Sequence, residues 1–233
     1  MTRQLETLRH VPFFRSLTDD DVRALDKQCF WRRYEAKQQI LRRGEGGTDV
    51  FFVIGGAVRA LIPATGGREV ILGDVCAGDF FGELAAIDGQ PRSASIVAIA
   101  RATVARMPAR VFRKAVHTHP DCCDQMLAVM AGRLRLLDRR VNELSSLNIK
   151  HRVLAELLRL SRPDRTDRRR AIVSPPPYHA EIAGRVLARR EAVTRELKLL
   201  EDSGQLERRR GAFVLTDVQA MLAQIRDFKS GDC

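Results

Sequence analysis

Apolar residues recur at alternating steps of four and three through the middle of this chain, from Cys123 to Leu144. The positions are Cys123, Leu127, Met130, Leu134, Leu137, Val141 and Leu144. A heptad stripe of this length is typical of a long helix that packs against an identical parallel helix. Pro120 suits the first position of that helix, and Asp121 and Asp124 suit its first turn. The narrow stripe therefore predicts a dimer seam; the alternative is a helix that packs only on its own domain.

The residues before this helix alternate short apolar runs with glycine-containing turns. The clearest runs are VFFVIGGAVRALI, REVILGDVCAGDFFGEL and SIVAIARATVARM. Runs of this length, punctuated by Gly-Gly and Asp-Gly, predict short antiparallel strands. We therefore expect a small β-barrel or roll over residues 30–108.

The chain changes character after the long helix. HRVLAELLRLS reads as an amphipathic helix, SRPDRTDRRR as a basic loop, and Pro175–Pro177 as a break. Two short apolar faces between His179 and Arg209 then outline a helix-turn-helix, and QLERRRGAFVLTD reads as a two-stranded wing that turns at Gly211. These patterns predict an α+β protein.

We expect three parts in this chain. A β-roll domain covers residues 1–118, a dimerisation helix covers 119–147, and a winged helix-turn-helix covers 148–233.

The chain is strongly basic, with 40 Lys and Arg against 29 Asp and Glu and a net charge of +11. Such a balance favours an anionic partner, nucleic acid or a membrane surface, although a solvated basic surface is the alternative. No apolar run is long enough for a transmembrane helix, and the charged N-terminal stretch has no signal-peptide core. The five cysteines form no CxxC pair, which indicates free thiols in a reducing cytoplasm.

The stretch FFGELAAIDGQPRSAS places a carboxylate and a guanidinium in the β-rich region. Gly82 has no Cβ, so the backbone there can approach a ligand closely. Glu83 can accept a hydrogen bond from a ribose hydroxyl, and Arg92 offers a donor fork for phosphate. The Ser93 hydroxyl and the amides of Ser93 and Ala94 add donors. We read AIDGQP as a hairpin-like connection. The pair suggests a ligand with sugar and phosphate; a Glu83–Arg92 ion pair across the turn is the alternative.

This stretch resembles the phosphate-binding cassette of the cyclic-nucleotide-binding domain family. Gly-Asp-Phe, Gly-Glu-Leu, a short connection and Arg-Ser-Ala follow one another in the family's order. The resemblance implies that Arg92 and Ser93 bind the cyclic phosphate and that Glu83 binds the 2′-hydroxyl. The implied pocket residues are Gly82, Glu83, Leu84, Arg92, Ser93 and Ala94.

The second helix of the helix-turn-helix carries residue types that read bases. Arg190, Glu191 and Arg195 lie at or near its N-terminal turn. Arginine pairs with guanine and glutamate accepts from cytosine, and the first residues of a recognition helix reach base edges. The run Arg208–Arg210 suits phosphates. The alternative is a solvated helix in which Glu191 and Arg195 form an ion pair.

The segment HAEIAGRVLARREAVTRELKLLEDSGQLERR resembles the winged helix-turn-helix of the cyclic-AMP receptor protein and fumarate-nitrate regulator family. The order of roll, long helix and winged domain matches that family over nearly the full chain. The resemblance implies a homodimeric transcription regulator, not an enzyme, that binds double-stranded DNA at a palindromic TGTGA-like site. It also implies RNA polymerase as a partner and cyclic AMP as allosteric ligand. The implied DNA-binding residues are His179, Arg189, Arg190, Glu191 and Arg195.

The sequence departs from the family pattern in three places. The turn before Arg190 reads Leu187-Ala188-Arg189 where a glycine is usual, and Tyr178 and His179 stand where a Ser or Thr cap is expected. On the long helix, Leu137 and Asp138 replace a Thr-Ser pair that faces the purine. A carboxylate can accept from both N1–H and the 2-amino group of guanine, so we expect cyclic GMP to bind as well as cyclic AMP.

Two rival functions remain open from the sequence. One is a family member that senses a redox or gas signal with a vestigial nucleotide pocket. The other is a regulatory module of an enzyme, although the chain shows no phosphate loop. A metal site is not expected, because the candidate ligands straddle a helix start and their side chains diverge. Those candidates are His117, His119, Asp121, Cys122 and Cys123.

Overall fold

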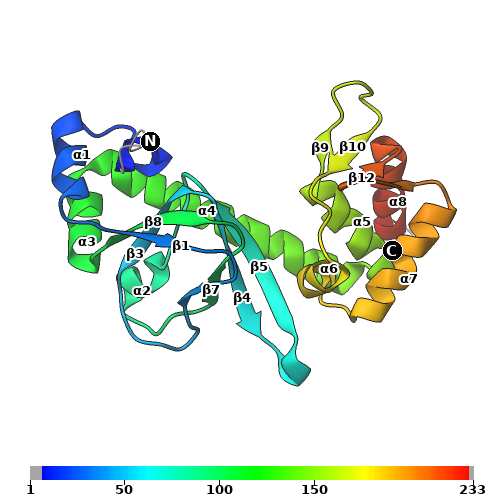
Figure 1. Cartoon of the computed structure of the whole chain (residues 1–233), viewed down its shortest axis with the longest axis horizontal. Helices are drawn as coiled ribbons and strands as arrows, with labels where there is room; N and C mark the ends of the chain where they lie inside the picture. The colour runs from blue at the N-terminus through cyan, green and yellow to red at the C-terminus, as the bar shows by residue number, and fades with distance from the viewer. Residues whose placement is uncertain (1–6, 231–233) are drawn as a thin grey trace. The chain divides into compact units, whose positions relative to one another are not determined.

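The computed structural model describes residues 7–230, so predictions that involve residues 1–6 and Cys233 lie outside the described chain. The chain divides into two compact units within its longest helix, α4 (Pro120–Ser146). The first unit ends at Arg133 and the second begins at Leu134. Figure 1 labels helices and strands of both units.

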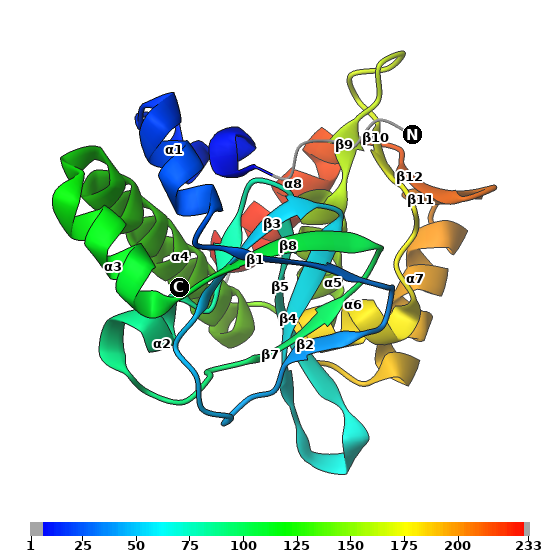
Figure 2. The same ribbon diagram turned by 60° about the vertical axis from the view of Figure 1, so that its left-hand side comes forward.

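The first unit contains two four-stranded antiparallel sheets, which confirms the predicted β-roll. Its strands are β1 (Phe30–Tyr34), β2 (Gln39–Leu41), β3 (Val50–Gly55), β4 (Ala57–Pro63), β5 (Glu69–Cys76), β6 (Phe80–Phe81), β7 (Ser95–Ala98) and β8 (Ala102–Met107). The strand orders are β1-β8-β3-β6 and β2-β7-β4-β5. The β4–β5 hairpin pairs seven residues of β4 with β5 and extends beyond the other strands in Figure 2.

Strand β3 is buried on both faces because successive residues point to opposite sides of a strand. Phe51 stacks on Phe81 inside the roll, with ring centroids 5.1 Å apart. Phe52 faces the other way and contacts Phe14 and Phe80, at centroid distances of 4.9 Å and 5.5 Å. This second cluster joins the sheet to the helices that cover it.

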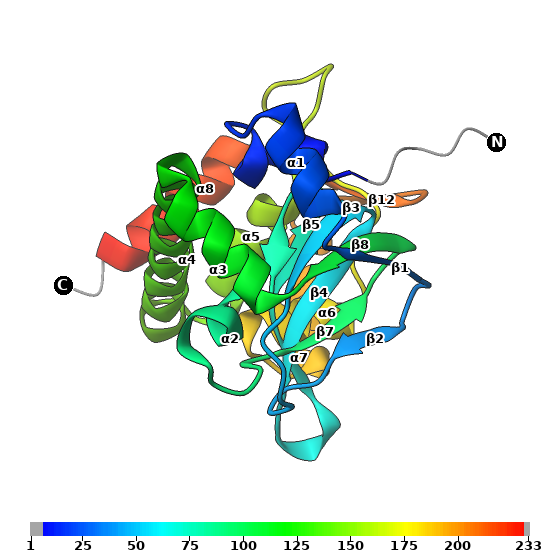
Figure 3. The same cartoon turned by 90° about the vertical axis from the view of Figure 1, so that its left-hand side faces the viewer.

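Those helices lie together on one side of the roll. Helices α1 (Asp19–Asp26) and α3 (Ala109–Thr118) and the first part of α4 all contribute to the phenylalanine cluster. Figure 3 shows the three beside one another. From α4, only Cys122 and Met126 are buried.

The connection AIDGQP is not hairpin-like, so that expectation was wrong. Glu83–Asp88 form a short helix, α2, with Gly82 before it and Gly89 after it. The φ angles of these glycines are 84° and 72°. Glycine adopts such angles without steric cost, so the chain can enter and leave the helix sharply.

Helix α4 is the long helix that the heptad pattern predicts, and it runs for 27 residues. Its apolar stripe is largely exposed in the single chain. Leu127, Leu134 and Val141 are 62%, 62% and 64% exposed. Exposed large apolar side chains in a row are typical of a contact surface.

The second unit contains the predicted helix-turn-helix and wing. After α4 it consists of α5 (Ile149–Leu160), β9 (Arg162–Pro163), β10 (Ala171–Val173), α6 (His179–Val186), α7 (Arg190–Asp202), β11 (Leu206–Arg209), β12 (Ala212–Leu215) and α8 (Val218–Ser230). The strand order is β11-β12-β10-β9. Apolar side chains from α5, α6, α7 and the sheet form one core.

Local geometry explains how the helix-turn-helix forms despite its unusual residues. Leu187 follows α6 with φ 52° and ψ 48°, the left-handed conformation that a glycine usually supplies. At the start of α6, the Glu181 carboxylate accepts a hydrogen bond from the Tyr178 amide at 2.9 Å. Gly211 turns the wing with φ 77°.

Cys29, Cys76, Cys122 and Cys123 are present as thiols. Burial raises the pKa of Cys29 to about 12 and that of Cys122 to about 11. Across residues 7–230, no three His, Cys, Asp or Glu residues are grouped so that they could hold a metal ion. No helix in that range combines the length and apolar character needed to cross a membrane.

Candidate functional site

Gly82 separates strand β6 from helix α2, and the space at this position accommodates no larger residue. A Cβ there would lie 2.7 Å from Nη1 of Arg92 and 2.9 Å from the carbonyl oxygen of Asp49. Real Cβ contacts are essentially never this short. The absence of a side chain therefore allows the Arg92 guanidinium to lie against the backbone before α2.

Arg92 is a buried cation with unused hydrogen-bonding capacity. It is 5% exposed, and its Nη1 donates to the carbonyl oxygen of Gly82 at 2.9 Å. Its guanidinium lies 5.5 Å from the centre of the Phe51 ring. Nε is buried and has no hydrogen-bond partner among the described residues. Burial lowers the pKa of Arg92, against the opposing charges of Asp49, Glu45 and Glu83. An anion beside it would offset this desolvation.

Glu83 is equally enclosed, at 3% exposed. Its Oε1 forms an ion pair with Nη1 of Arg133 on α4, and Nη2 of Arg133 donates to the carbonyl of Phe80 at 2.7 Å. Within the described residues, Oε2 of Glu83 has no hydrogen-bond partner. Burial raises the pKa of Glu83, and Arg133 and then Arg92 oppose that rise. Glu83 is thus paired with Arg133. The alternative interpretation of the sequence, a Glu83–Arg92 ion pair across the turn, required Arg92 as its partner.

The predicted pocket residues of the first unit line one small cavity of about 40 Å³. Its lining residues are Leu41, Gly82, Glu83, Leu84, Ala85, Arg92, Ser93, Ala94 and Ile96. Leu84 and Ser93 are exposed at the surface of the unit.

Sequence reasoning missed Arg133, which lies 50 positions after Glu83. It falls outside the heptad stripe, and no local pattern distinguishes it from the other arginines of α4. Leu137 and Asp138 lie on the part of α4 that belongs to the second unit, and both are exposed. Their contact with a purine stays a prediction.

The candidate reading residues lie on the outer face of α7. Val193, Leu197 and Leu200 are buried in the core of the second unit. The residues between and before them are therefore directed outward. The exposed set includes Arg189, Arg190, Glu191 and Arg195. The nearest acid recorded for Arg195 is its neighbour Glu196, at 3.9 Å, and not Glu191.

His179 connects the two helices of the motif. Its Nδ1 lies 2.8 Å from the Thr194 hydroxyl, which donates to the Arg190 carbonyl at 2.9 Å. His179 and Arg190 also line a cleft of about 520 Å³ with Arg208 of the wing. Burial and then the charges of Arg208 and Arg190 lower the pKa of His179. Two arginines thus line the cleft, and one of them, Arg208, forms an ion pair with Glu201.

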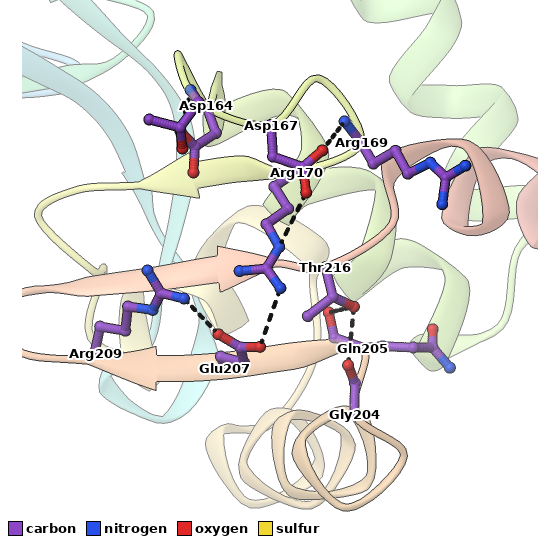
Figure 4. A network of polar contacts seen from close by, with 10 residues as sticks. Asp164, Asp167, Arg169, Arg170, Gly204, Gln205, Glu207, Arg209 and Thr216 are labelled. Atoms are coloured by element: carbon purple, nitrogen blue, oxygen red, sulfur yellow. Dashed lines mark hydrogen bonds and ion pairs between the residues drawn. The ribbon is translucent and has the colours of Figure 1, made fainter.

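The wing is held in place by a polar network (Figure 4). Arg170 lies between Asp167, at 3.4 Å, and Glu207, at 3.8 Å. Arg209 also pairs with Glu207, at 2.9 Å. The Thr216 hydroxyl donates to the carbonyl of Gly204 at 2.8 Å, at the end of α7. The ion pairs join the loop before β10 to β11, and Thr216 joins the wing to the turn that follows α7, the helix of the candidate reading residues.

Known families match both units. Residues 31–119 match the cyclic nucleotide-binding domain, and residues 151–224 match the Crp-like helix-turn-helix domain.

Characterised proteins match over most of the chain. It is 31% identical to the cAMP-activated global transcriptional regulator CRP of Escherichia coli O6:H1, over 79% of this chain and 89% of that protein. It is 35% identical to the cAMP-activated global transcriptional regulator Vfr of Pseudomonas aeruginosa, over 78% and 89%.

Among solved structures, a CooA mutant from Carboxydothermus hydrogenoformans superposes with a TM-score of 0.73 at 23% identity, over 85% of this chain and 88% of that chain. FixK2 from Bradyrhizobium japonicum gives a TM-score of 0.69 at 23% identity, over 84% and 96%. These two comparisons establish a shared fold.

The sequence identity to CRP and Vfr, together with both domain matches, establishes the relationship. The chain belongs to the Crp–Fnr family and is a cyclic-nucleotide-binding transcription regulator of the CRP type.

Proposed function

We propose that this protein is a homodimer that binds a palindromic TGTGA-like DNA site and that cyclic AMP or cyclic GMP raises its affinity for that site. The observation that carries the proposal is the buried pair of Arg92 and Glu83. Each has an enclosed polar atom without a hydrogen-bond partner in the described chain. A phosphate beside Arg92 and a ribose hydroxyl beside Glu83 would satisfy both atoms.

Cyclic AMP and cyclic GMP share the ribose and the cyclic phosphate, so the pocket of the first unit accepts both. The base is the distinguishing group, and we assign Leu137 and Asp138 to it. Guanine offers two donors to one carboxylate, whereas adenine offers its amino group. Calorimetry with each nucleotide tests the assignment. Heat from cyclic AMP alone would contradict binding of cyclic GMP.

DNA binding follows from the exposed face of α7. Arg190, Glu191 and Arg195 suit base edges, while Arg189, His179 and the wing arginines suit phosphates. CRP and Vfr are named as cAMP-activated regulators, which supports the same dependence here. The test is a gel shift on a palindromic TGTGA-type duplex with cyclic AMP, with cyclic GMP and with neither. Equal binding in all three lanes would contradict nucleotide control.

The exposed stripe of α4 supports the homodimer. Leu127, Leu134 and Val141 would be buried by a second copy of the helix, and heptad seams associate in this way. Sedimentation velocity of the wild type and of Leu134→Arg tests this step. We expect a dimer for the wild type and a monomer for the variant. A monomeric wild type at micromolar concentration would contradict the seam.

In this proposal the protein is a cytoplasmic regulator and not an enzyme, and RNA polymerase is a further partner. A redox- or gas-responsive regulator is the competing function. Visible absorbance of the purified protein separates the two, because haem and iron–sulfur centres absorb there.

A further inference from the structure

A buried carboxylate lies in the second unit, away from the residues proposed to read DNA. Glu156 of α5 is 1% exposed. It forms an ion pair with Arg159, one turn further along the same helix. Its Oε1 lies 3.6 Å from Nη1 of Arg185 on α6, a side chain that is 6% exposed. Well-packed apolar residues often stabilise a core at least as well as buried ion pairs. This buried pair therefore calls for a role beyond stability.

The same charges extend to the end of α4. Nη2 of Arg159 donates to both carboxylate oxygens of Glu143, each at 2.7 Å. Arg140, one turn before Glu143, is partly buried, and burial lowers its pKa while the charge of Glu156 opposes that shift. Glu143, Arg159, Glu156 and Arg185 thus connect α4, α5 and α6 in one continuous series, which we call the ion-pair relay.

The relay ends on the helix that positions the reading residues. Arg152 of α5 donates to the carbonyl of Val186 at 2.9 Å, a second link between α5 and the end of α6. His179, at the start of α6, contacts Thr194 of α7 at 2.8 Å. A displacement of α6 is therefore transmitted to α7 and to the arginines on its outer face.

The first part of α4 contacts a residue of the proposed nucleotide pocket. Arg133, ten residues before Glu143, forms the ion pair with Glu83 in the first unit. One helix thus carries a contact to the pocket carboxylate and a contact to the relay. Ion pairs have discrete, directional partners, which makes them suited to an element with two arrangements.

We infer that the ion-pair relay Glu143–Arg159–Glu156–Arg185 transmits the state of α4 to the reading helix and so determines how strongly cyclic nucleotide controls DNA affinity. Glu143 is a positioning residue in this scheme, because it touches neither nucleotide nor DNA. The inference rests on the proposed function and adds the residues through which it operates.

The experiment measures the ratio of DNA dissociation constants without and with cyclic AMP, by fluorescence anisotropy with the full-length protein. Glu143→Gln removes the carboxylate to which Arg159 donates its hydrogen bonds. We expect the ratio to fall by about two- to thirtyfold, while the affinity for cyclic AMP without DNA stays unchanged. Glu143→Asp, which keeps the charge, should retain part of the ratio.

Asp167→Asn is the matched control. It also removes one negative charge and one ion pair from the second unit, at Arg170 (Figure 4). Asp167 is not one of the four residues of the relay. Any general effect of charge on DNA affinity appears equally in both variants and cancels in the ratio. The control should keep the wild-type ratio.

The outcomes separate the two hypotheses. A wild-type ratio of one contradicts the proposed function. A wild-type ratio above one that is unchanged in Glu143→Gln overturns the relay alone. The relay is also overturned if the ratio falls as much in Asp167→Asn as in Glu143→Gln. Circular dichroism checks folding. If Glu143→Gln melts below the assay temperature, Arg159→Gln replaces it, because Arg159 joins Glu143 to Glu156, and the same criteria apply.

Discussion

The Glu83 carboxylate of α2 is paired with the Arg133 guanidinium of α4, across 50 positions of sequence. Its second oxygen is buried and has no hydrogen-bond partner in the described chain. Burial disfavours the charged form of Glu83, and the positive charge of Arg133 opposes that effect.

We predict that Glu83→Gln weakens cyclic AMP binding by about 1.5–3 kcal/mol, the usual contribution of a hydrogen bond to a charged group. The amide keeps the shape of the side chain but loses the charge that Arg133 orients. Calorimetry measures the change. Glu69→Gln, at an exposed position on β5, is the control and should bind as the wild type does. An unchanged affinity in Glu83→Gln would remove this carboxylate from the site.

Arg92→Ala should cost about 2–5 kcal/mol of nucleotide affinity, because a buried charge-assisted contact to phosphate is lost. DNA binding would then no longer respond to nucleotide, while sedimentation still shows a dimer. Arg43→Ala, an exposed arginine near the roll surface, serves for comparison. Full activation of Arg92→Ala by cyclic AMP would refute the phosphate assignment.

Gly82→Ala should destabilise the first unit more than Gly89→Ala. Both glycines have a φ angle in the left-handed region. At Gly82 the Cβ that alanine adds would meet backbone and guanidinium atoms within 3 Å, whereas at Gly89 it would meet none within 4 Å. We expect a further loss of about 1–3 kcal/mol from this overpacking. Urea denaturation gives the difference, and equal values for the two variants would contradict the close approach.

Arg190→Ala should cost about 1–3 kcal/mol and relax the preference at one base pair, whereas Arg208→Ala should weaken all sequences evenly and lower the salt slope by about 1. The reason is position: Arg190 begins the recognition helix, and Arg208 lies on the wing. Competition assays with single-base variants of the site distinguish them. A uniform loss in Arg190→Ala would make that residue a phosphate contact.

DNA binding should strengthen as the pH falls from about 8 to about 5, the range in which histidine titrates. Burial and the charges of Arg208 and Arg190 lower the pKa of His179, and Glu201 opposes them. A DNA phosphate in this cleft would raise that pKa again, so binding takes up a proton and the affinity increases with acidity. His179→Gln should show a flatter pH profile. Identical profiles for wild type and variant would contradict the linkage.

The sequence predicted most elements because their periodicity is local. The heptad stripe identified α4, and the glycine-punctuated runs identified the roll. Helix α2 was missed because six residues between two glycines carry too little periodicity to distinguish a helix from a turn. The left-handed Leu187 shows that a fold can impose a conformation that its residue disfavours.

The site was only partly predictable for a different reason. Gly82, Glu83 and Arg92 lie within one short stretch, so a motif could identify them. Arg133 and the ion-pair relay join residues from separate helices, and such partners depend on packing that no local pattern encodes.

The burial of two thiols has a practical consequence for spectroscopy. Maleimides react with thiolate, and the raised pKa values of Cys29 and Cys122 keep those sulfurs protonated at neutral pH. Cys76, exposed at the end of β5, should be modified well before either of them. A dye attached there would report on the β4–β5 hairpin and leave Cys29 and Cys122 unmodified.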